Sequence, residues 1–473
     1  MRISLAVSLV VLGVGCAHAP EQVQEPAPQQ AVSTLAPATQ KAADPKALSE
    51  QANQSYEALN FPACAEQFRQ AAEAQTDDES RSGSFYSAAC CASLAGDTSK
   101  ALELMKRSVQ SGYFDADYAQ ADPELFPLHS LPGWQEVLSG AQANLTKAPY
   151  RPRPIPVLAG VDVYGSRRAD VETVRRQLGF ELGKPFVGSQ ALFKQKEEAL
   201  KKQYNLAFAK LSLITYFAGT EANKAYVTAD LVDAEDAQRL KFLPAPSGHP
   251  VDPEGLVAQW QEYESKGWQL MQRGQVDLAK PGACRVAHCI MGFSHPELAP
   301  YEPIFLEKVP KAQDGVAQVL HEDTDERKRA AAAFLLAYAA TPAQAVERLA
   351  PSIRDPSALV RNNVLRVMMA LQQKSDHPLV DIATAVDALG MPETTDRNKA
   401  GHLLLAILED MKPEQVKAQK ASLLRQLGPQ LVAMAAMQQP INRDPAVGIL
   451  KLLSGEKYDS PEQWKAWLAR QPK

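Results

Sequence analysis

Three stretches in the C-terminal half of the chain decide its fold: DERKRAAAAFLLAYA (residues 325–339), LVRNNVLRVMMALQQ (359–373) and TDRNKAGHLLLAILEDM (395–411). Each stretch has charged residues within its first three positions and continues as an apolar run with helical spacing. Arg327, Arg361 and Arg397 hold matching places in them, 34 and 36 residues apart. A repeat of this length predicts stacked helix pairs, because one pair cannot bury its apolar face alone.

The segments between these stretches, PAQAVERLAPSIRD (342–355) and HPLVDIATAVDALG (377–390), supply the second helix of each pair. Ladders of Asp and Arg in the turns of stacked helix pairs are a feature of HEAT repeats, and residues 297–473 resemble that family. The resemblance implies a continuous helical array with a long concave surface. It also implies a ladder made of Asp325, Arg327, Asp355, Arg361, Asp396 and Arg397.

The end of the chain, YDSPEQWKAWLARQ (458–471), predicts a helix that closes this array. Ser460 and Gln463 have the spacing of a capping box, and Pro461 suits the first helical position. We therefore expect this helix to be a structural cap.

Residues 45–148 show a second helical repeat. Ala65 and Ala101 hold the same place in successive predicted helix pairs, 36 residues apart, and Tyr56 and Ala72 complete the pattern. This pattern resembles tetratricopeptide (TPR) repeats, which implies another small array of helix pairs.

The middle segment, residues 151–240, changes from helical to mixed spacing. IPVLAGVDVYG (155–165) predicts a strand, two helical patterns follow, and FAKLSLITYF (208–217) and AYVTADLV (225–232) alternate as a hairpin does. The order β-α-α-β-β resembles a polypeptide-transport-associated (POTRA) domain. The resemblance implies partner binding by strand addition to an open sheet edge. The alternative is a small α/β packing domain. The predicted fold class is therefore mainly α, an α-solenoid with one small central α/β domain.

The first twenty residues, MRISLAVSLVVLGVGCAHAP, predict that the chain is exported from the cytoplasm. Residues 1–15 have the short basic start and apolar stretch of a signal peptide. Leu12 to Cys16 resembles a bacterial lipobox, which implies lipidation of Cys16 and an outer-membrane lipoprotein facing the periplasm. Residues 16–44, rich in Pro, Gln and Ala, predict a disordered tether. The alternatives are a plain secreted protein and a lipoprotein at the cell surface.

The linker region, residues 241–296, contains the cysteine-rich stretch CRVAHCIMGFSH (284–295). In an exported protein, thiols that meet tend to be oxidised, which favours a Cys284–Cys289 disulfide that acts as a structural staple. A metal site would use His288 and His295, but the stretch lacks the paired spacing of zinc ligands. Free or reactive thiols are the third possibility.

Three further cysteines lie in the N-terminal repeat, on neighbouring predicted helices. They are either small buried core residues or include a second disulfide, Cys64 with Cys90 or Cys91.

The sequence favours a scaffold over an enzyme. It contains no P-loop, no G-x-S-x-G and no H-E-x-x-H motif, so neither catalytic residues nor a cofactor are predicted. A net charge of −5 argues against nucleic acid as partner, and no small-molecule substrate is predicted. We expect a protein that binds envelope proteins or peptides during assembly, secretion or maintenance of the cell surface. The alternatives are an exported hydrolase or redox enzyme using the 284–295 loop, and a purely structural surface lipoprotein.

Overall fold

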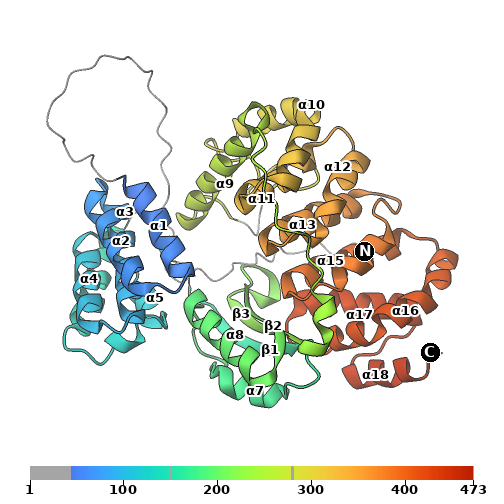
Figure 1. Cartoon of the computed structure of the whole chain (residues 1–473), viewed down its shortest axis with the longest axis horizontal. Coiled ribbons are helices and arrows are strands. Elements are labelled where there is room, and N and C mark those ends of the chain that lie inside the picture. Colours follow the sequence, from blue (N-terminus) through green and yellow to red (C-terminus); the bar gives the residue numbers. More distant parts are fainter. Residues whose placement is uncertain (1–43, 149–150, 153, 278–281, 472–473) are drawn as a thin grey trace.

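The computed structural model describes residues 44–148, 151–152, 154–277 and 282–471. The predicted signal peptide, Cys16 and the tether up to residue 43 lie outside the described residues. The described chain is mainly α-helical, with a small three-stranded sheet between two helical units (Figure 1). The predicted fold class is confirmed.

The N-terminal helical unit is built from antiparallel helix pairs. The side chains of Asp44, Asn60, Asp77 and Asp97 accept a backbone N–H at the start of the first four helices, which satisfies donors that have no partner within the helix. A core that contains Phe68 joins them. The helices are α1 (Pro45–Glu57), α2 (Phe61–Ala74), α3 (Asp78–Leu94), α4 (Thr98–Gln110), α5 (Ala116–Ala121) and α6 (Trp134–Asn144).

The central sheet has the order β1-β3-β2, with β1 parallel and β2 antiparallel to β3. The predicted hairpin is confirmed, but its second strand, 225–232, lies in the middle of the sheet and not at an edge. Gly165 ends β1 with φ +97°, where a Cβ would collide with the carbonyl oxygen of Leu231. The elements are β1 (Val157–Tyr164), α7 (Val171–Leu178), α8 (Gln190–Tyr204), β2 (Leu206–Thr215) and β3 (Lys224–Asp233).

The two faces of the sheet differ in chemistry. One face packs its apolar side chains against Val174 of α7 and Leu200 of α8. The other face carries Asp162, Thr228 and Asp230, all of which are buried against the C-terminal helices. Buried polar groups need partners, so this second face fixes how the sheet meets the helices.

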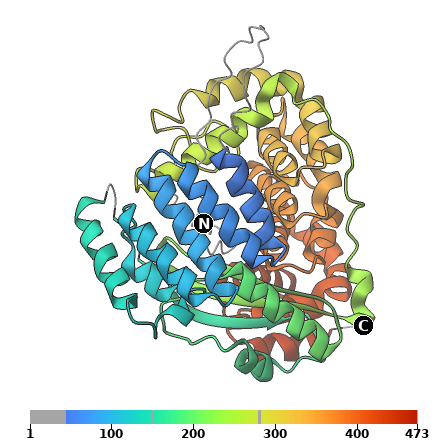
Figure 2. The same cartoon turned by 60° about the vertical axis from the view of Figure 1, so that its left-hand side comes forward.

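The C-terminal helices form two layers. In what we call the inner layer, α9, α11, α13, α15 and α17 pack side by side, on the side toward the N-terminal helical unit (Figures 1 and 2). The outer layer consists of α10, α12, α14 and α16. The helices are α9 (Leu256–Gln272), α10 (Tyr301–Glu322), α11 (Glu326–Leu335), α12 (Pro342–Leu349), α13 (Ala358–Lys374), α14 (Ile382–Leu389), α15 (Thr394–Asp410), α16 (Pro413–Ala435), α17 (Pro440–Ser454) and α18 (Pro461–Ala469).

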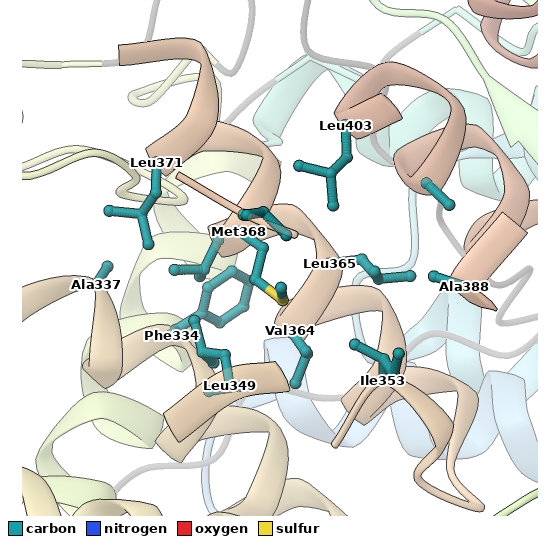
Figure 3. Close-up of a cluster of buried hydrophobic side chains, with 14 of the residues drawn as sticks. Phe334, Ala337, Leu349, Ile353, Val364, Leu365, Met368, Leu371, Ala388 and Leu403 are labelled. Carbon is teal, nitrogen blue, oxygen red and sulfur yellow. The ribbon is translucent and has the colours of Figure 1, made fainter. Parts of the chain in front are cut away.

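The apolar core of this array runs from repeat to repeat. Phe334, Leu349, Met368 and Leu403 come from four different helices and belong to one buried cluster (Figure 3). Helix α18 closes the array with the predicted Ser460 capping box. Stacking therefore supplies the core that no single pair has.

The linker between the sheet and α9 runs as a strap across the turns of the array. Leu243 N donates to Arg354 O (2.7 Å), and Gly248 N donates to Glu322 O (2.9 Å). The ring of Phe242 lies 4.8 Å from the guanidinium carbon of Arg361. The strap thus covers the edge of the array formed by the turns that precede the inner-layer helices α11 and α13.

Buried polar contacts also join the N-terminal helical unit to the sheet region. Glu124 accepts hydrogen bonds from Tyr56 and from Ser189 Oγ (2.6 Å), which begins α8. The Tyr56 hydroxyl in turn accepts the N–H of Ala191 (3.3 Å). At the far end, Arg273 and Glu79 form an exposed ion pair (3.3 Å) between the end of α9 and the start of α3.

Candidate functional site

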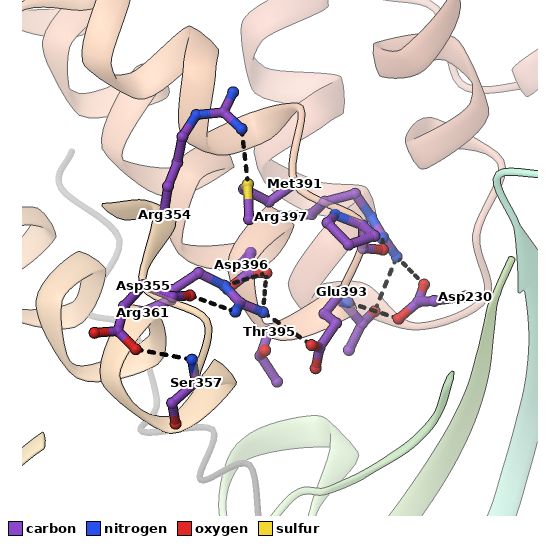
Figure 4. A network of polar contacts seen from close by, with 12 residues as sticks. Asp230, Arg354, Asp355, Ser357, Arg361, Met391, Glu393, Thr395, Asp396 and Arg397 are labelled. Atoms are coloured by element: carbon purple, nitrogen blue, oxygen red, sulfur yellow. Dashed lines mark hydrogen bonds and ion pairs between the residues drawn. The ribbon is translucent and has the colours of Figure 1, made fainter. Parts of the chain in front are cut away.

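Three arginines at matching positions connect successive repeats. Each uses Nη1 to donate to carbonyl oxygens in the turn before its own helix, and its other nitrogens reach a carboxylate of the next unit. Figure 4 shows two of the three, Arg361 and Arg397. Arg329 reaches Asp355 (2.9 Å), and Arg361 reaches Asp396 (3.0 Å). All four side chains are buried.

The last rung leaves the helical array and enters the sheet. Arg397, also fully buried, donates to Asp230 of β3, and Asp230 accepts the N–H of Thr394 as well. Burial raises the pKa of Asp230 to about 6, although the charge of Arg397 opposes this rise. Because each of these arginines is bound to a buried carboxylate of the chain, the ladder is a structural connection and not an open site.

The predicted first rung of the ladder was wrong. Arg327 and Asp325 are exposed, and Asp325 caps α11 by accepting the backbone N–H of Arg327 (2.8 Å). Arg329 takes the expected place because its side chain is buried and reaches Asp355, in the turn before α13. The spacing of 34 residues predicted Arg327, two positions before the arginine that forms the contact, because the repeats differ in length.

The cysteine-rich loop is held against the array by several contacts. The sulfur atoms of Cys284 and Cys289 lie at bonding distance (1.99 Å). The hydroxyl of Tyr263 receives the N–H of Met291 (3.2 Å), and Lys374 donates to Val286 O (2.8 Å). These contacts are compatible with the structural staple expected from the sequence.

The two histidines of the loop have separate surroundings. The ring of His288 stacks on Phe334, with centroids 5.3 Å apart, whereas His295 accepts the N–H of Glu297 (3.3 Å). Within the described ranges, no three His, Cys, Asp or Glu residues group as metal ligands would.

The N-terminal cysteines divide into a pair and a buried thiol. Cys64 and Cys91 have their sulfur atoms at bonding distance (1.98 Å). Cys90 points elsewhere and donates to Asp122 Oδ2 (3.7 Å). Of the two partners that the sequence left open for Cys64, the structure places Cys91 beside it.

A set of polar side chains on the inner layer was missed by sequence reasoning. On α13, Asn362, Arg366 and Ala370 follow one another at four-residue spacing, so they share the side of the helix away from core residues such as Val364 and Met368. We call this side of the inner layer the inner face. Glu264 of α9, which is hydrogen-bonded to Trp268, and Lys399 of α15 lie near Arg366, and His402 lies near Lys399, so they belong to this face as well.

The inner face shifts the pKa of its titratable groups through burial. The pKa of Arg366 is lowered to about 10, and that of Lys399 is lowered well below its usual value. Burial raises the pKa of Glu264 to about 7 and lowers that of His402 to about 4. His288 from the cysteine loop belongs to the same environment, because Arg366 and Lys399 join burial in lowering its pKa to about 3.

One signal for this cluster is present in the sequence. Arg366 and Lys399 interrupt the apolar helices of two successive repeats, where charged residues are expensive unless they have a partner or a role. Recognising them as neighbours required the packing of α13 on α15, which comes from contacts 33 residues apart in the chain.

Comparisons with protein-family models, with curated proteins and with solved structures gave no match for this chain. Among the helices in the described ranges, none has both the length and the apolar character needed to cross a membrane.

Proposed function

We propose that the chain is a membrane-anchored periplasmic scaffold that holds another envelope polypeptide against its inner face. The observation that carries this proposal is the composition of that face. The inner layer buries an apolar side in the core, and its other side carries the buried Arg366 and Lys399 beside the partly exposed Glu264 and His402. A face with unused hydrogen-bond donors suits a polypeptide, which offers carbonyl and carboxylate oxygens along its length.

The rigid mounting of the inner face supports a holding role. The N-terminal helical unit is joined to the sheet region through Tyr56, Glu124 and Ser189. The sheet is joined to the array through Asp162, which accepts the N–H groups of Gln438 and Gln439 (both 2.9 Å). A preorganised surface loses less conformational entropy when it binds a partner.

Strand addition to the sheet is the less favoured binding mode. Strand β3, which the sequence suggested as the edge, lies between two others. On the outer side of β1, Leu158 exchanges hydrogen bonds with Gly183 and Lys184 (2.8 and 2.9 Å). On the outer side of β2, Leu211 N donates to Glu197 (2.7 Å). The chain's own groups thus use part of the hydrogen-bonding capacity of both edges.

The predicted lipidation of Cys16 and outer-membrane address supply the location in this proposal. A tether of 29 residues would have ends on the order of 30 Å apart as a flexible coil, which lets the folded part stand away from the membrane. The likeness of the two helical units to TPR and HEAT repeats supports a binding role, because such arrays hold polypeptides in extended surfaces.

The test is cross-linking of the full-length anchored chain in intact cells, followed by purification under denaturing conditions. A discrete second polypeptide should be recovered with the wild-type chain, and its yield should fall in a Cys16→Ser variant that lacks the anchor. The double variant Cys284→Ser/Cys289→Ser is the control for a catalytic loop and should still recover the partner. Recovery of the chain alone, or digestion of the folded part by protease added to intact cells, would contradict a periplasmic scaffold.

A further inference from the structure

Arg366 and Lys399 lie on neighbouring parallel helices. The starts of α13 and α15 are joined by Arg361 and Asp396 (3.0 Å), and their ends by Gln372 and Asp410 (2.8 Å). Arg366 comes five residues after the first contact on α13, and Lys399 three residues after it on α15. At 1.5 Å per residue, the two Cα atoms differ in height by only about 3 Å along the helices.

Both cations are buried without a matching anion. Arg366 is 7% exposed and Lys399 is 4% exposed. Nε of Arg366 has no acceptor, and among the described residues no carboxylate forms an ion pair with either side chain. Within the described ranges, the acceptors of Lys399 are Asn398 Oδ1 (3.1 Å) and Thr395 O (3.4 Å), which are neutral.

Further buried polar atoms of the inner face have no hydrogen-bond partner among the described residues, and they include donors and one acceptor, Asn362 Oδ1. Asn398 Nδ2 is a buried donor without a partner in the part of the chain that the structure describes, and so is His288 Nε2 in the tautomer that carries its proton there. Glu264 is the acidic group that acts on Arg366, and burial raises its pKa to about 7, so it carries only part of a negative charge near neutral pH. Asp396 lies near Lys399 but is already bound to Arg361. The two basic side chains therefore have one carboxyl group nearby that is not already bound to another arginine, that of Glu264.

An uncompensated buried charge is among the most expensive features of a protein interior. A bound oxyanion would supply acceptors to Arg366, Lys399 and Asn398 together, and it would neutralise the excess charge. The alternative, that these side chains serve only the core, would require the carboxylate partners that Arg329 and Arg361 have and that Arg366 and Lys399 lack among the described residues.

We propose that Arg366 and Lys399 form an oxyanion site on the inner face, and that this site takes a carboxylate of the bound polypeptide. The carboxylate source rests on the proposed function, whereas the site itself does not. Partly exposed His402 and Glu264 border the two buried cations, so the carboxylate would approach between α9 and α15.

The test is calorimetric titration of the purified protein at constant ionic strength with two probes, inorganic phosphate and a short peptide rich in Asp and Glu. The matching peptide with Asn and Gln is the negative control. Both anionic probes should bind the wild-type protein, and Arg366→Gln or Lys399→Met should weaken both by about tenfold or more, the loss expected for a charge-assisted hydrogen bond. Arg425→Gln and Lys417→Met, at exposed positions of α16, are the matched controls and should leave binding unchanged.

The outcomes separate this inference from the proposed function. Phosphate binding without binding of the acidic peptide would support the oxyanion site and contradict a polypeptide carboxylate as its occupant. Peptide binding that survives Arg366→Gln and Lys399→Met would support the scaffold and overturn the site. Absence of binding by both probes would overturn the site. Arg366→Lys keeps the positive charge and should retain part of the phosphate affinity. This variant therefore separates loss of the charge from a folding defect caused by any change at position 366.

Discussion

At the scale of single residues, the buried side chain of Arg361 binds several groups of the array at once. It binds Asp396 (3.0 Å) and Glu393 (2.8 Å), and it also donates to the carbonyl oxygen of Asp355 (2.8 Å). Burial raises the pKa of Glu393 to about 7, and the positive charge of Arg361 opposes that rise. Two buried carboxylates thus depend on one guanidinium.

We predict that Arg361→Met lowers the free energy of unfolding by about 3–5 kcal/mol, because it leaves buried acidic groups without their cation. Arg327→Met, at the exposed position first predicted for the ladder, should change it by less than about 0.5 kcal/mol. Urea unfolding of the two variants measures both values. Equal effects of the two substitutions would show that the ladder does not connect the repeats as described.

His288 gives a prediction about pH. Its pKa is about 3 in the folded chain, because burial and the charges of Arg366, Lys374 and Lys399 disfavour the protonated ring. In the unfolded chain, His288 takes up a proton below about pH 6.5, whereas in the folded chain it stays neutral. The unfolded state then binds more protons, so this residue makes the fold less stable as the pH falls from about 6.5 toward 3.

The variant His288→Phe keeps the stacking on Phe334 and removes the titration. We expect the wild-type chain to lose stability relative to this variant between pH 6.5 and pH 4.5, measured by urea unfolding at both values. A difference that does not change with pH would mean that His288 is open to protonation in the folded chain.

At the scale of elements, the cysteine loop links α9 to α10 and packs on the aromatic core. Cys289 Sγ lies 3.4 Å from the hydroxyl of Tyr338, and Tyr263 stacks on Phe293 with ring centroids 4.8 Å apart. These contacts place the loop between the inner layer and α10, so it is expected to hold α9 in register with the rest of the array.

Removal of the Cys284–Cys289 pair should destabilise the array without abolishing binding at the inner face. We predict that Cys284→Ser/Cys289→Ser lowers the free energy of unfolding by about 2 kcal/mol, the value expected when a short closed loop is released in the unfolded chain. Thermal unfolding measures the loss of stability, and phosphate titration of the same variant measures the affinity of the inner face for an anion. A variant that unfolds like the wild type would contradict the staple interpretation.

The sequence predicted those elements whose signals lie within one short segment, and it did not predict features that depend on contacts between distant segments. The hairpin followed from alternation in residues 208–217 and 225–232, and the helix at 461–469 followed from its own capping residues. The sheet order did not follow, because the pairing of Val157 with Lys224 joins residues far apart in the chain. In the same way, Arg361 and Asp396 were recognised from a repeated pattern. Arg366 and Lys399 were not, because their meaning arises only when α13 packs on α15.

At the scale of the whole molecule, buried polar contacts tie the three units into one frame. Asp230 is the key example, because it belongs to the sheet and ends the arginine ladder of the array. The ring of Tyr164, also from the sheet, lies 3.9 Å from the guanidinium carbon of Arg397. Such contacts make the sheet and the array depend on each other.

We therefore predict a single cooperative thermal transition for the wild-type chain, measured by calorimetry. Asp230→Ala leaves Arg397 buried and without its carboxylate, and it should separate the transition of the sheet region from that of the array. Asp236→Ala, at a carboxylate that pairs with the exposed side chain of Arg167, is the control and should keep one transition. Separate transitions in the wild-type chain would contradict the single frame.

The central claim is that the inner face, and neither the sheet edge nor the cysteine loop, binds a partner. Photo-cross-linking in intact cells tests it most directly, with the photoreactive residue placed at Ala370, one turn after Arg366, or at Ala421 on the outer layer. The account predicts a discrete adduct with a second polypeptide from position 370 alone, and loss of that adduct when Arg366→Gln is added. An adduct of equal yield from both positions, or an adduct from position 370 that survives Arg366→Gln, would contradict it.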